Sequence, residues 1–337
     1  MATPEPGPSP ANEQKYLIEV SDLCKRFGNV VAVDKISFGV ARGELFGFLG
    51  PNGAGKTTTI NMLTGLARPD SGSLRINGLD CTKNPKAAQH LTGIVPDESN
   101  LYPELSGFDN LCFCAELYGM PKIERRARAR ELLEVFGLKD AGERKFAGYS
   151  KGMKRKLTIA AGIIHHPLIL FLDEPTTGID VASARQIRQL IAELHQAGTT
   201  IFLTTHYIEE AERLCERIAF IVKGKIVRID SLADLLQPMQ EMKAMLLSTS
   251  NCTGDLYGQL TQAFPDINFK PVSDEQIRVE SNHPIHIGPL IRFVEQQGCE
   301  IIEARRLKPS LEDVFVQVTG IELAAMKMDK EKGKGNS

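Results

Sequence analysis

A glycine-rich segment carries the clearest chemistry in this chain. Residues 50–57 read Gly-Pro-Asn-Gly-Ala-Gly-Lys-Thr and fit the pattern G-x-x-x-x-G-K-[ST]. Glycine lets the backbone turn its N–H groups inward around phosphate oxygens. The Lys56 ammonium can bind the β- and γ-phosphates as a catalytic group, and the Thr57 hydroxyl can ligate Mg²⁺. The residues expected to hold the phosphates are Gly50, Pro51, Asn52, Gly53, Ala54, Gly55, Lys56, Thr57 and Thr58.

The residues on either side of this segment have the pattern that such a loop requires. The apolar run Leu45–Leu49 predicts a buried parallel strand, and the residues from Thr57 to Leu66 predict a helix. Gly65 and Pro69 should end that helix. A strand, a glycine loop and a helix in this order disfavour the alternative of an ordinary surface turn. We therefore expect a binding site for a nucleoside triphosphate.

Two further predicted strands lead into side chains that suit hydrolysis of the triphosphate. Residues 168–172 are followed by Asp173 and Glu174, and residues 200–205 are followed by His206. Asp173 can hold Mg²⁺, while Glu174 can orient and polarise an attacking water. Because the carboxyl ends of parallel strands meet at one edge of a sheet, these groups should lie beside the phosphate loop. We predict catalytic roles for Glu174 and His206; the alternatives are an acidic loop without function and a structural histidine.

Composition excludes several classes of protein. The 337 residues are 42% hydrophobic and 24% charged, as in soluble globular proteins. The formal net charge of −2 offers no electrostatic attraction for nucleic acid or anionic lipid. No apolar run approaches the roughly 20 residues that span a bilayer. The N-terminus lacks the basic start and apolar core of a secretion signal, so we expect a cytoplasmic protein.

The cysteines indicate no cross-linked or metal-bound framework. Seven occur, at positions 24, 81, 112, 114, 215, 252 and 299, and no two form a C-x-x-C pair. The odd number and the spacing favour neither a set of disulfides nor a zinc site. We expect reduced, mostly buried thiols.

A five-residue segment makes the resemblance to one family specific. Residues 149–153, Tyr-Ser-Lys-Gly-Met, resemble the L-S-G-G-Q signature of ATP-binding-cassette (ABC) ATPases and lie about twenty residues before the Asp-Glu pair. Lys151 and Met153 depart from the commonest form, and this variant resembles the drug-export and multidrug branch, whose membrane subunit is a separate chain. The resemblance implies that Ser150 and Gly152 contact nucleotide through a hydroxyl, a glycine backbone and a helix N-terminus.

The resemblance covers about residues 16–238 and implies further site residues. Phe27 matches the aromatic residue that stacks on adenine, with a core position as the alternative. Residues 175–180 match the loop that touches the partner ATPase. Asp97 stands where the family usually carries glutamine. It can still serve the nucleotide and the metal, which its place at a strand end favours, or it can face the membrane subunit instead.

The fold class that follows is α/β. We expect a phosphate-loop ABC ATPase domain over residues 16–238, with a RecA-like core and an inserted helical subdomain at about 97–165. In the family this subdomain meets the membrane subunit. Helices are predicted from Ser106 to Tyr118 and from Ile123 to Phe136.

A second, smaller domain is predicted over residues 240–320. Its pattern gives strands at 244–248, 268–272, 276–280 and 300–307, and helices at 254–264 and 287–297. The order β-α-β-β-α-β indicates an α+β ferredoxin-like module, for which we expect a regulatory or dimerisation role. Ser310 should cap a last helix. Residues 1–15 and 321–337 are expected to be disordered.

The resemblance implies a Mg²⁺-dependent ATPase, the ATP-hydrolysing subunit of an exporter. A polytopic transmembrane permease would be its partner, and the subunit would sit peripherally on the cytoplasmic face of the cell membrane. One phosphate loop and one signature per chain imply a homodimer or a heterodimer of ATPase subunits. The alternative is an ABC ATPase that acts on nucleic acid or ribosomes. The nearly balanced charge disfavours it, as do the glutamates interleaved with the arginines at 125–130. A module that holds ATP without turnover would lack Glu174 or His206.

Overall fold

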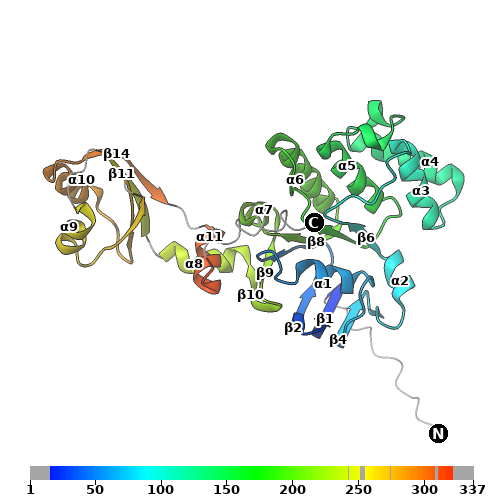
Figure 1. Ribbon diagram of the computed structural model, residues 1–337, viewed down its shortest axis with the longest axis horizontal. Coiled ribbons are helices and arrows are strands. Elements are labelled where there is room, and N and C mark those ends of the chain that lie inside the picture. The colour runs from blue at the N-terminus through cyan, green and yellow to red at the C-terminus, as the bar shows by residue number, and fades with distance from the viewer. Residues whose placement is uncertain (1–15, 242, 251–254, 274, 308–309, 322–337) are drawn as a thin grey trace, which may run out of the picture. The chain divides into compact units, whose positions relative to one another are not determined.

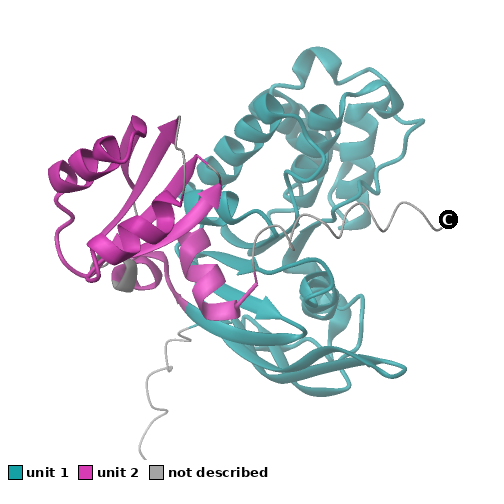
Figure 2. Cartoon of the chain, turned by 60° about the vertical axis from the view of Figure 1, so that its left-hand side comes forward, with its two compact units in different colours: residues 1–229, 324–337 teal, residues 230–323 magenta. Residues whose placement is uncertain are grey.

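The chain folds into two compact units, one of the described residues up to Ile229 and one of those from Asp230 onward (Figures 1 and 2). The computed structural model describes residues 16–241, 243–250, 255–273, 275–307 and 310–321. The segments 1–15 and 322–337, predicted to be disordered, lie outside the described residues, as do Gly254 and Cys252. The second unit begins at Asp230, earlier than the domain boundary predicted at residues 238–240.

The first unit is built on a largely parallel sheet of six strands in the order β10-β9-β3-β8-β7-β6. Its strands are β3 (Leu45–Leu49), β6 (Thr92–Val95), β7 (Ile169–Asp173), β8 (Thr200–Thr205), β9 (Arg217–Val222) and β10 (Lys225–Ser231). All residues of β3, β7 and β8 are buried, as their continuous apolar runs predict. The sheet therefore places the three predicted strands that lead to the site, β3, β8 and β7, next to one another.

A second sheet of four strands, in the order β2-β1-β4-β5, packs against the first. Its strands are β1 (Ile18–Phe27), β2 (Val30–Val40), β4 (Ser71–Ile76) and β5 (Leu79–Asp80). Between the sheets lies α1 (Lys56–Leu63), whose apolar residues join a core with Phe38 of β2 and Phe46 of β3. These two rings stack with centroids 5.7 Å apart. Helix α1 ends earlier than predicted because Gly65 adopts a φ of +74°.

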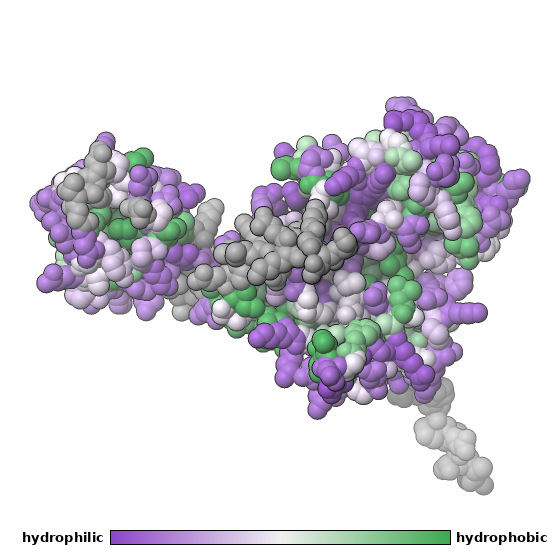
Figure 3. All heavy atoms as spheres, in the orientation of Figure 1, coloured by the Kyte–Doolittle hydropathy of each residue, from purple (hydrophilic) through white to green (hydrophobic). Residues whose placement is uncertain are grey.

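Helices gather at the β6 edge of the six-stranded sheet (Figure 1). The helices of this unit are α2 (Pro85–His90), α3 (Gly107–Leu117), α4 (Lys122–Val135), α5 (Lys151–Gly162), α6 (Val181–Gln196) and α7 (Ile208–Leu214). Helices α3 and α4 occupy the residues predicted to be helical. Helices α3, α4 and α5 contact one another and make up the helical region that follows β6. The face drawn in Figure 3 is hydrophilic along the outer edge of this helical region and mixed, with apolar patches, further in.

The second unit has the predicted succession of strands and helices. It contains α8 (Leu232–Glu241), β11 (Lys243–Ser250), α9 (Leu256–Ala263), β12 (Asn268–Ser273), β13 (Gln276–Ser281), α10 (Ile287–Gln296), β14 (Glu300–Leu307) and α11 (Leu311–Thr319). The antiparallel sheet has the order β12-β13-β11-β14. Its core holds apolar residues of both α9 and α10, and Ser310 caps α11 by accepting from Asp313 N. This β-α-β-β-α-β unit is ferredoxin-like in order.

One expectation about the cysteines is wrong. Cys24, Cys81, Cys112, Cys114 and Cys215 are free thiols, but Cys299 is disulfide-bonded. The sequence contains no C-x-x-C pair, so no local spacing signalled this bond. Among the described helices, none is both long enough and apolar enough to cross a membrane.

The contact between β6 and α5 allows a test of the packing. Gly93 is buried, and a Cβ at that position would lie 2.1 Å from the Gly162 carbonyl oxygen. Because backbone cannot move aside as a flexible side chain does, we expect Gly93→Ala to lower the free energy of unfolding by about 1–3 kcal/mol. Urea denaturation would measure it. Gly148→Ala, where a Cβ has only Arg144 at 4.0 Å, is the control. Equal stabilities of the two variants would contradict this packing.

Candidate active site

The phosphate loop has the conformation that its glycines permit. Gly53 and Gly55 have φ values of +74° and +105°, and a Cβ on Gly55 would lie 2.4 Å from the Ala32 carbonyl oxygen. A Cβ on Gly50 would meet the Ile221 carbonyl at 2.2 Å. The loop ends at Lys56, the first residue of α1, so its N–H groups lie at a helix N-terminus.

A cavity of about 410 Å³ opens beside this loop. It is lined by Val30, Val31, Ala32, Asn52, Gly53, Gly55, Lys56, Thr57, Thr58, Glu174 and Lys223. Five residues of the predicted phosphate loop, together with Thr58 and the predicted catalytic carboxylate, therefore face one space.

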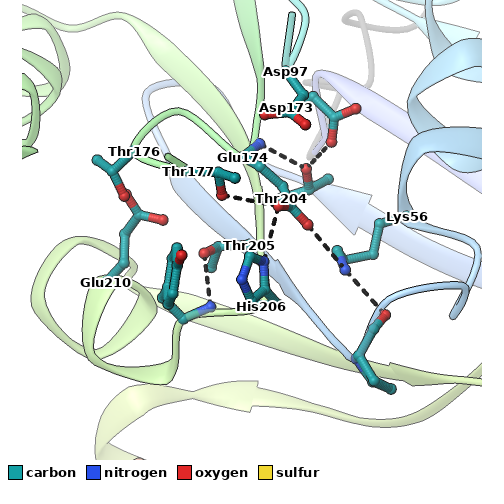
Figure 4. Close-up of polar contacts among 12 residues, drawn as sticks. Lys56, Asp97, Asp173, Glu174, Thr176, Thr177, Thr204, Thr205, His206 and Glu210 are labelled. Carbon is teal, nitrogen blue, oxygen red and sulfur yellow. Dashed lines mark hydrogen bonds and ion pairs between the residues drawn. The ribbon is translucent and has the colours of Figure 1, made fainter. Parts of the chain in front are cut away.

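Lys56 is held by oxygen atoms on several sides. Its Nζ donates to the carbonyls of Gly50 at 2.8 Å and Pro51 at 3.0 Å and lies 3.3 Å from Oε1 of Glu174. Burial lowers the pKa of Lys56, and the negative charge of Glu174 opposes that shift. The ammonium therefore sits at the phosphate end of the cavity with a carboxylate beside it (Figure 4).

Thr57 and Asp173 form the pair that suits a divalent cation. The Thr57 hydroxyl donates to Oδ2 of Asp173 at 3.0 Å, and the Thr204 hydroxyl donates to Oδ1. Hydroxyl and carboxylate oxygens are the ligands that Mg²⁺ prefers, and Mg²⁺ usually takes its remaining ligands from phosphates and water. Within the described part of the chain, no cluster of three or more histidine, cysteine or acidic residues could hold a metal alone. The pair thus fits a cation that binds together with a nucleotide.

Glu174 is fixed from three directions. Its Oε2 lies 2.8 Å from Nδ1 of His206 and accepts from the Thr177 hydroxyl at 2.9 Å, while Oε1 faces Lys56 (Figure 4). Burial by itself would raise the pKa of Glu174, but the His206 ring at 2.8 Å and the Lys56 charge outweigh it and lower the pKa to about 2. Its backbone has a φ of +47°, a conformation that non-glycine residues seldom adopt. The carboxylate is therefore charged and held in one place.

The comparisons with known proteins agree with this geometry. The family model described as "ABC transporter" matches residues 33–177. A linearmycin resistance ATP-binding protein of Bacillus subtilis is 33% identical over 307 residues, covering 90% of this chain and 98% of its own. A Nod factor export ATP-binding protein of Paraburkholderia xenovorans is 35% identical over 326 residues, covering 91% and 98%.

Solved structures support the same assignment. An ATP-binding subunit of an ABC transporter superposes with a TM-score of 0.61 at 31% identity, covering 66% of this chain and 93% of that one. The chain belongs to the ABC transporter family. It is an ATP-binding subunit with ATPase activity, related to the drug-export branch, and the predicted family and fold class are confirmed.

The signature of this ABC ATPase lies apart from its own phosphate loop. Ser150 caps α5 by accepting from Met153 N at 3.2 Å. Gly152 packs against Ser183 of α6, where an added Cβ would lie 2.6 Å from the hydroxyl. Neither residue lines the cavity beside Lys56. Within one chain, the predicted nucleotide-binding residues thus occupy two places.

Two other predicted residues lie outside that cavity as well. Phe27 is 55% exposed at the end of β1, which rules out the alternative of a core residue. The Lys25 ammonium lies 5.4 Å from its ring centroid. Asp97 is half exposed, and its Oδ1 lies 3.6 Å from Nη2 of Arg155 on α5.

The sequence reasoning missed several polar residues around the site. Thr204 and Thr177 bond to the two carboxylates, and the buried Glu210 accepts from the Thr176 hydroxyl at 2.8 Å. Burial raises the pKa of Glu210. The threonines at the end of an otherwise apolar strand were the available signal for Thr204. Glu210 lies in α7, where an acidic run looks like a solvated helix face.

The lowered pKa of Glu174 predicts how stability depends on pH. A carboxyl with a pKa of about 2 in the fold, against a usual 4.5, stabilises the fold above pH 4.5 and loses this effect as pH falls toward 2. Glu174→Gln should therefore be less stable than the wild type at pH 7, by a margin that shrinks below pH 4.5.

Urea denaturation between about pH 3 and 7 would measure this margin. Glu104→Gln, whose original side chain is 82% exposed, should show no such dependence. A margin that stays constant over the whole range would show that the Glu174 charge does not stabilise the fold.

Proposed function

We propose that this chain is the ATP-hydrolysing subunit of an exporter and drives a separate transmembrane permease through ATP-dependent dimerisation. The observation that carries the chemistry is the charged Glu174, held by His206 and Thr177 beside the phosphate-binding lysine. A carboxylate so placed can accept a hydrogen bond from water next to the terminal phosphate. Holding an attacking water in line is the main task of such a residue in phosphoryl transfer.

Each remaining group has a defined task in this proposal. The loop N–H groups and Lys56 bind the triphosphate, and Phe27 stacks on the base. Thr57 and Asp173 would hold Mg²⁺. A bound Mg²⁺ would neutralise charge on the phosphate oxygens. His206 positions Glu174 through the 2.8 Å contact and holds the carboxylate toward the phosphate end of the cavity.

The absence of Ser150 and Gly152 from the lining of the cavity beside Lys56 supports a dimer. Ser150 and Gly152 would contact the nucleotide that a second ATPase subunit holds, and residues 175–180 would touch that subunit. An ATP-binding cassette that is 26% identical has been solved as a dimer with ADP and phosphate, with a TM-score of 0.59. We propose either a homodimer or a heterodimer.

The membrane partner is inferred from the relatives. One relative is named a Nod factor export ATP-binding protein and another a daunorubicin resistance ATP-binding protein, and each matches about nine-tenths of this chain. We propose that a polytopic permease binds the helical region around α3 and α4, and that the subunit therefore lies on the cytoplasmic face of the membrane. The ferredoxin-like unit would regulate or stabilise the dimer. No nucleic acid is involved.

Two substitutions separate binding from hydrolysis. Lys56→Ala should lose nucleotide binding or turnover, because the phosphates lose their main cationic partner. Glu174→Gln should still bind ATP but hydrolyse it about 10²–10⁴-fold more slowly, so that an ATP-bound dimer accumulates. Phosphate release and size-exclusion chromatography with ATP and Mg²⁺ would measure both effects. The control is Glu104→Gln, and a normal rate in Glu174→Gln would remove that residue from its role.

A mixing experiment tests the shared site. A dimer of Ser150→Arg with Lys56→Ala keeps one intact pair, the phosphate loop of the first with the signature of the second. Each variant alone should be inactive, and dimers purified through two different tags should recover part of the activity. Inactive mixed dimers, once their formation is demonstrated, would argue against a signature that acts across the interface.

A further inference from the structure

A buried arginine on the signature helix has no task in the proposed reaction. Arg155 lies in α5, beyond the Ser150 cap, and is only 7% exposed. Burial disfavours a charged guanidinium unless it has hydrogen-bond acceptors and an opposite charge. The side chain must therefore be held by specific partners.

Those partners belong to the loop that follows β6. Arg155 Nη1 donates to the Pro96 carbonyl at 2.5 Å, and Nη2 donates to the Asp97 carbonyl. The same Nη2 lies 3.6 Å from Oδ1 of Asp97. A guanidinium presents its donors in a fixed planar fork. These contacts therefore set both the distance of the loop from α5 and its orientation.

A second contact ties the same two elements together. The hydroxyls of Ser99 in the loop and Thr158 in α5 lie 2.8 Å apart, and Thr158 is 2% exposed. Thr158 follows Arg155 by three residues and so lies on the same face of the helix. Two positions one turn apart on α5 thus hold residues 96–99.

The far end of α5 is fixed to the strand from which this loop emerges. The Gly162 carbonyl approaches Gly93 of β6 so closely that no side chain fits there. Strand β6, residues 96–99 and α5 therefore form a closed set of contacts, with Ser150 at the free end of the helix.

The arginine also faces the surface where a second subunit is proposed to bind. A cavity of about 540 Å³ is lined by Arg155, Asp97 and Lys151, and on its other side by Thr177, Gly178 and Ile179. The last three belong to the loop after Glu174. A shift of residues 96–99 would therefore move the walls of this cavity on the α5 side.

We propose that Arg155 is a positioning residue that joins the Asp97 loop to the signature helix, so that the loop and Ser150 move as one body, and that the Asp97 carboxylate serves Arg155 rather than a metal ion. This inference rests on the proposed function, because Ser150 acts on nucleotide held by a second subunit. An aspartate at position 97 supplies the negative charge that a glutamine would not. The permease, if it moves this loop, moves the signature with it.

The first test measures ATP-driven dimerisation in the Glu174→Gln background by sedimentation. Arg155→Gln should raise the ATP concentration for half-maximal dimerisation about tenfold, a typical effect of losing a coupled contact. Lys156→Gln, which changes a neighbouring charge that lines a different groove, should leave it unchanged. Binding of a fluorescent ATP analogue to the monomer should also stay unchanged, because Arg155 does not line the cavity beside Lys56.

The second test asks whether Asp97 and Arg155 act through each other. The effects of Asp97→Asn and Arg155→Gln on dimerisation should be far from additive, and Arg155→Lys should recover part of the loss. Hydrogen exchange should rise together at residues 97–101 and in the first turn of α5. The Mg²⁺ concentration for half-maximal dimerisation should be the same in Asp97→Asn as in its parent.

The outcomes separate the two proposals. A Glu174→Gln parent that fails to dimerise with ATP would count against the proposed function itself. Three outcomes would each overturn the proposed role of Arg155. They are normal dimerisation of Arg155→Gln, additive effects of the two variants, and a raised Mg²⁺ requirement in Asp97→Asn. Asp97→Asn changes a half-exposed side chain, so it provides a folded test protein even if Arg155→Gln is unstable.

Discussion

Lys56 carries an ammonium group into a site where only 5% of its side chain is exposed. A buried charge of this kind requires acceptors and an opposite charge nearby, or it loses its proton. Two loop carbonyls and Glu174 meet that need, and Glu174 is in turn held by His206 and Thr177. Loss of one partner leaves another charge buried without compensation, so the groups proposed to bind phosphate and those proposed to direct water depend on one another.

The parallel sheet is what makes this dependence possible. Strands β3, β8 and β7 are adjacent in the sheet. The phosphate loop follows β3, His206 follows β8, and the Asp173–Glu174 pair lies at the end of β7. The strand ends are buried, so no side chain there can turn away to solvent. The positions of the charges are therefore set by the register of the sheet more than by the flexibility of the loops.

The sequence predicted the parts of the site that a strand end or a glycine pattern encodes. The phosphate loop, the two carboxylates and His206 could be placed because each follows an apolar run. Contacts between distant segments carry no such local pattern. Arg155 looks like one member of a basic run on a helix, and Glu210 like one member of an acidic run, yet both are buried. The Cys299 disulfide was missed for the same reason. Helix α1 ended earlier than predicted because Gly65 leaves the helical conformation with a φ of +74°.

The proposed base side of the nucleotide site, at Phe27, differs sharply from the proposed phosphate side. Phe27 is 55% exposed, and Val30 and Val31 beside it are 66% and 38% exposed. A phenyl ring offers a stacking surface but no hydrogen-bond donor or acceptor, and every nucleobase has a face that can stack on it. Discrimination against the wrong base needs buried polar groups that would be left unpaired. A site built as proposed would recognise the triphosphate closely and the identity of the base only weakly.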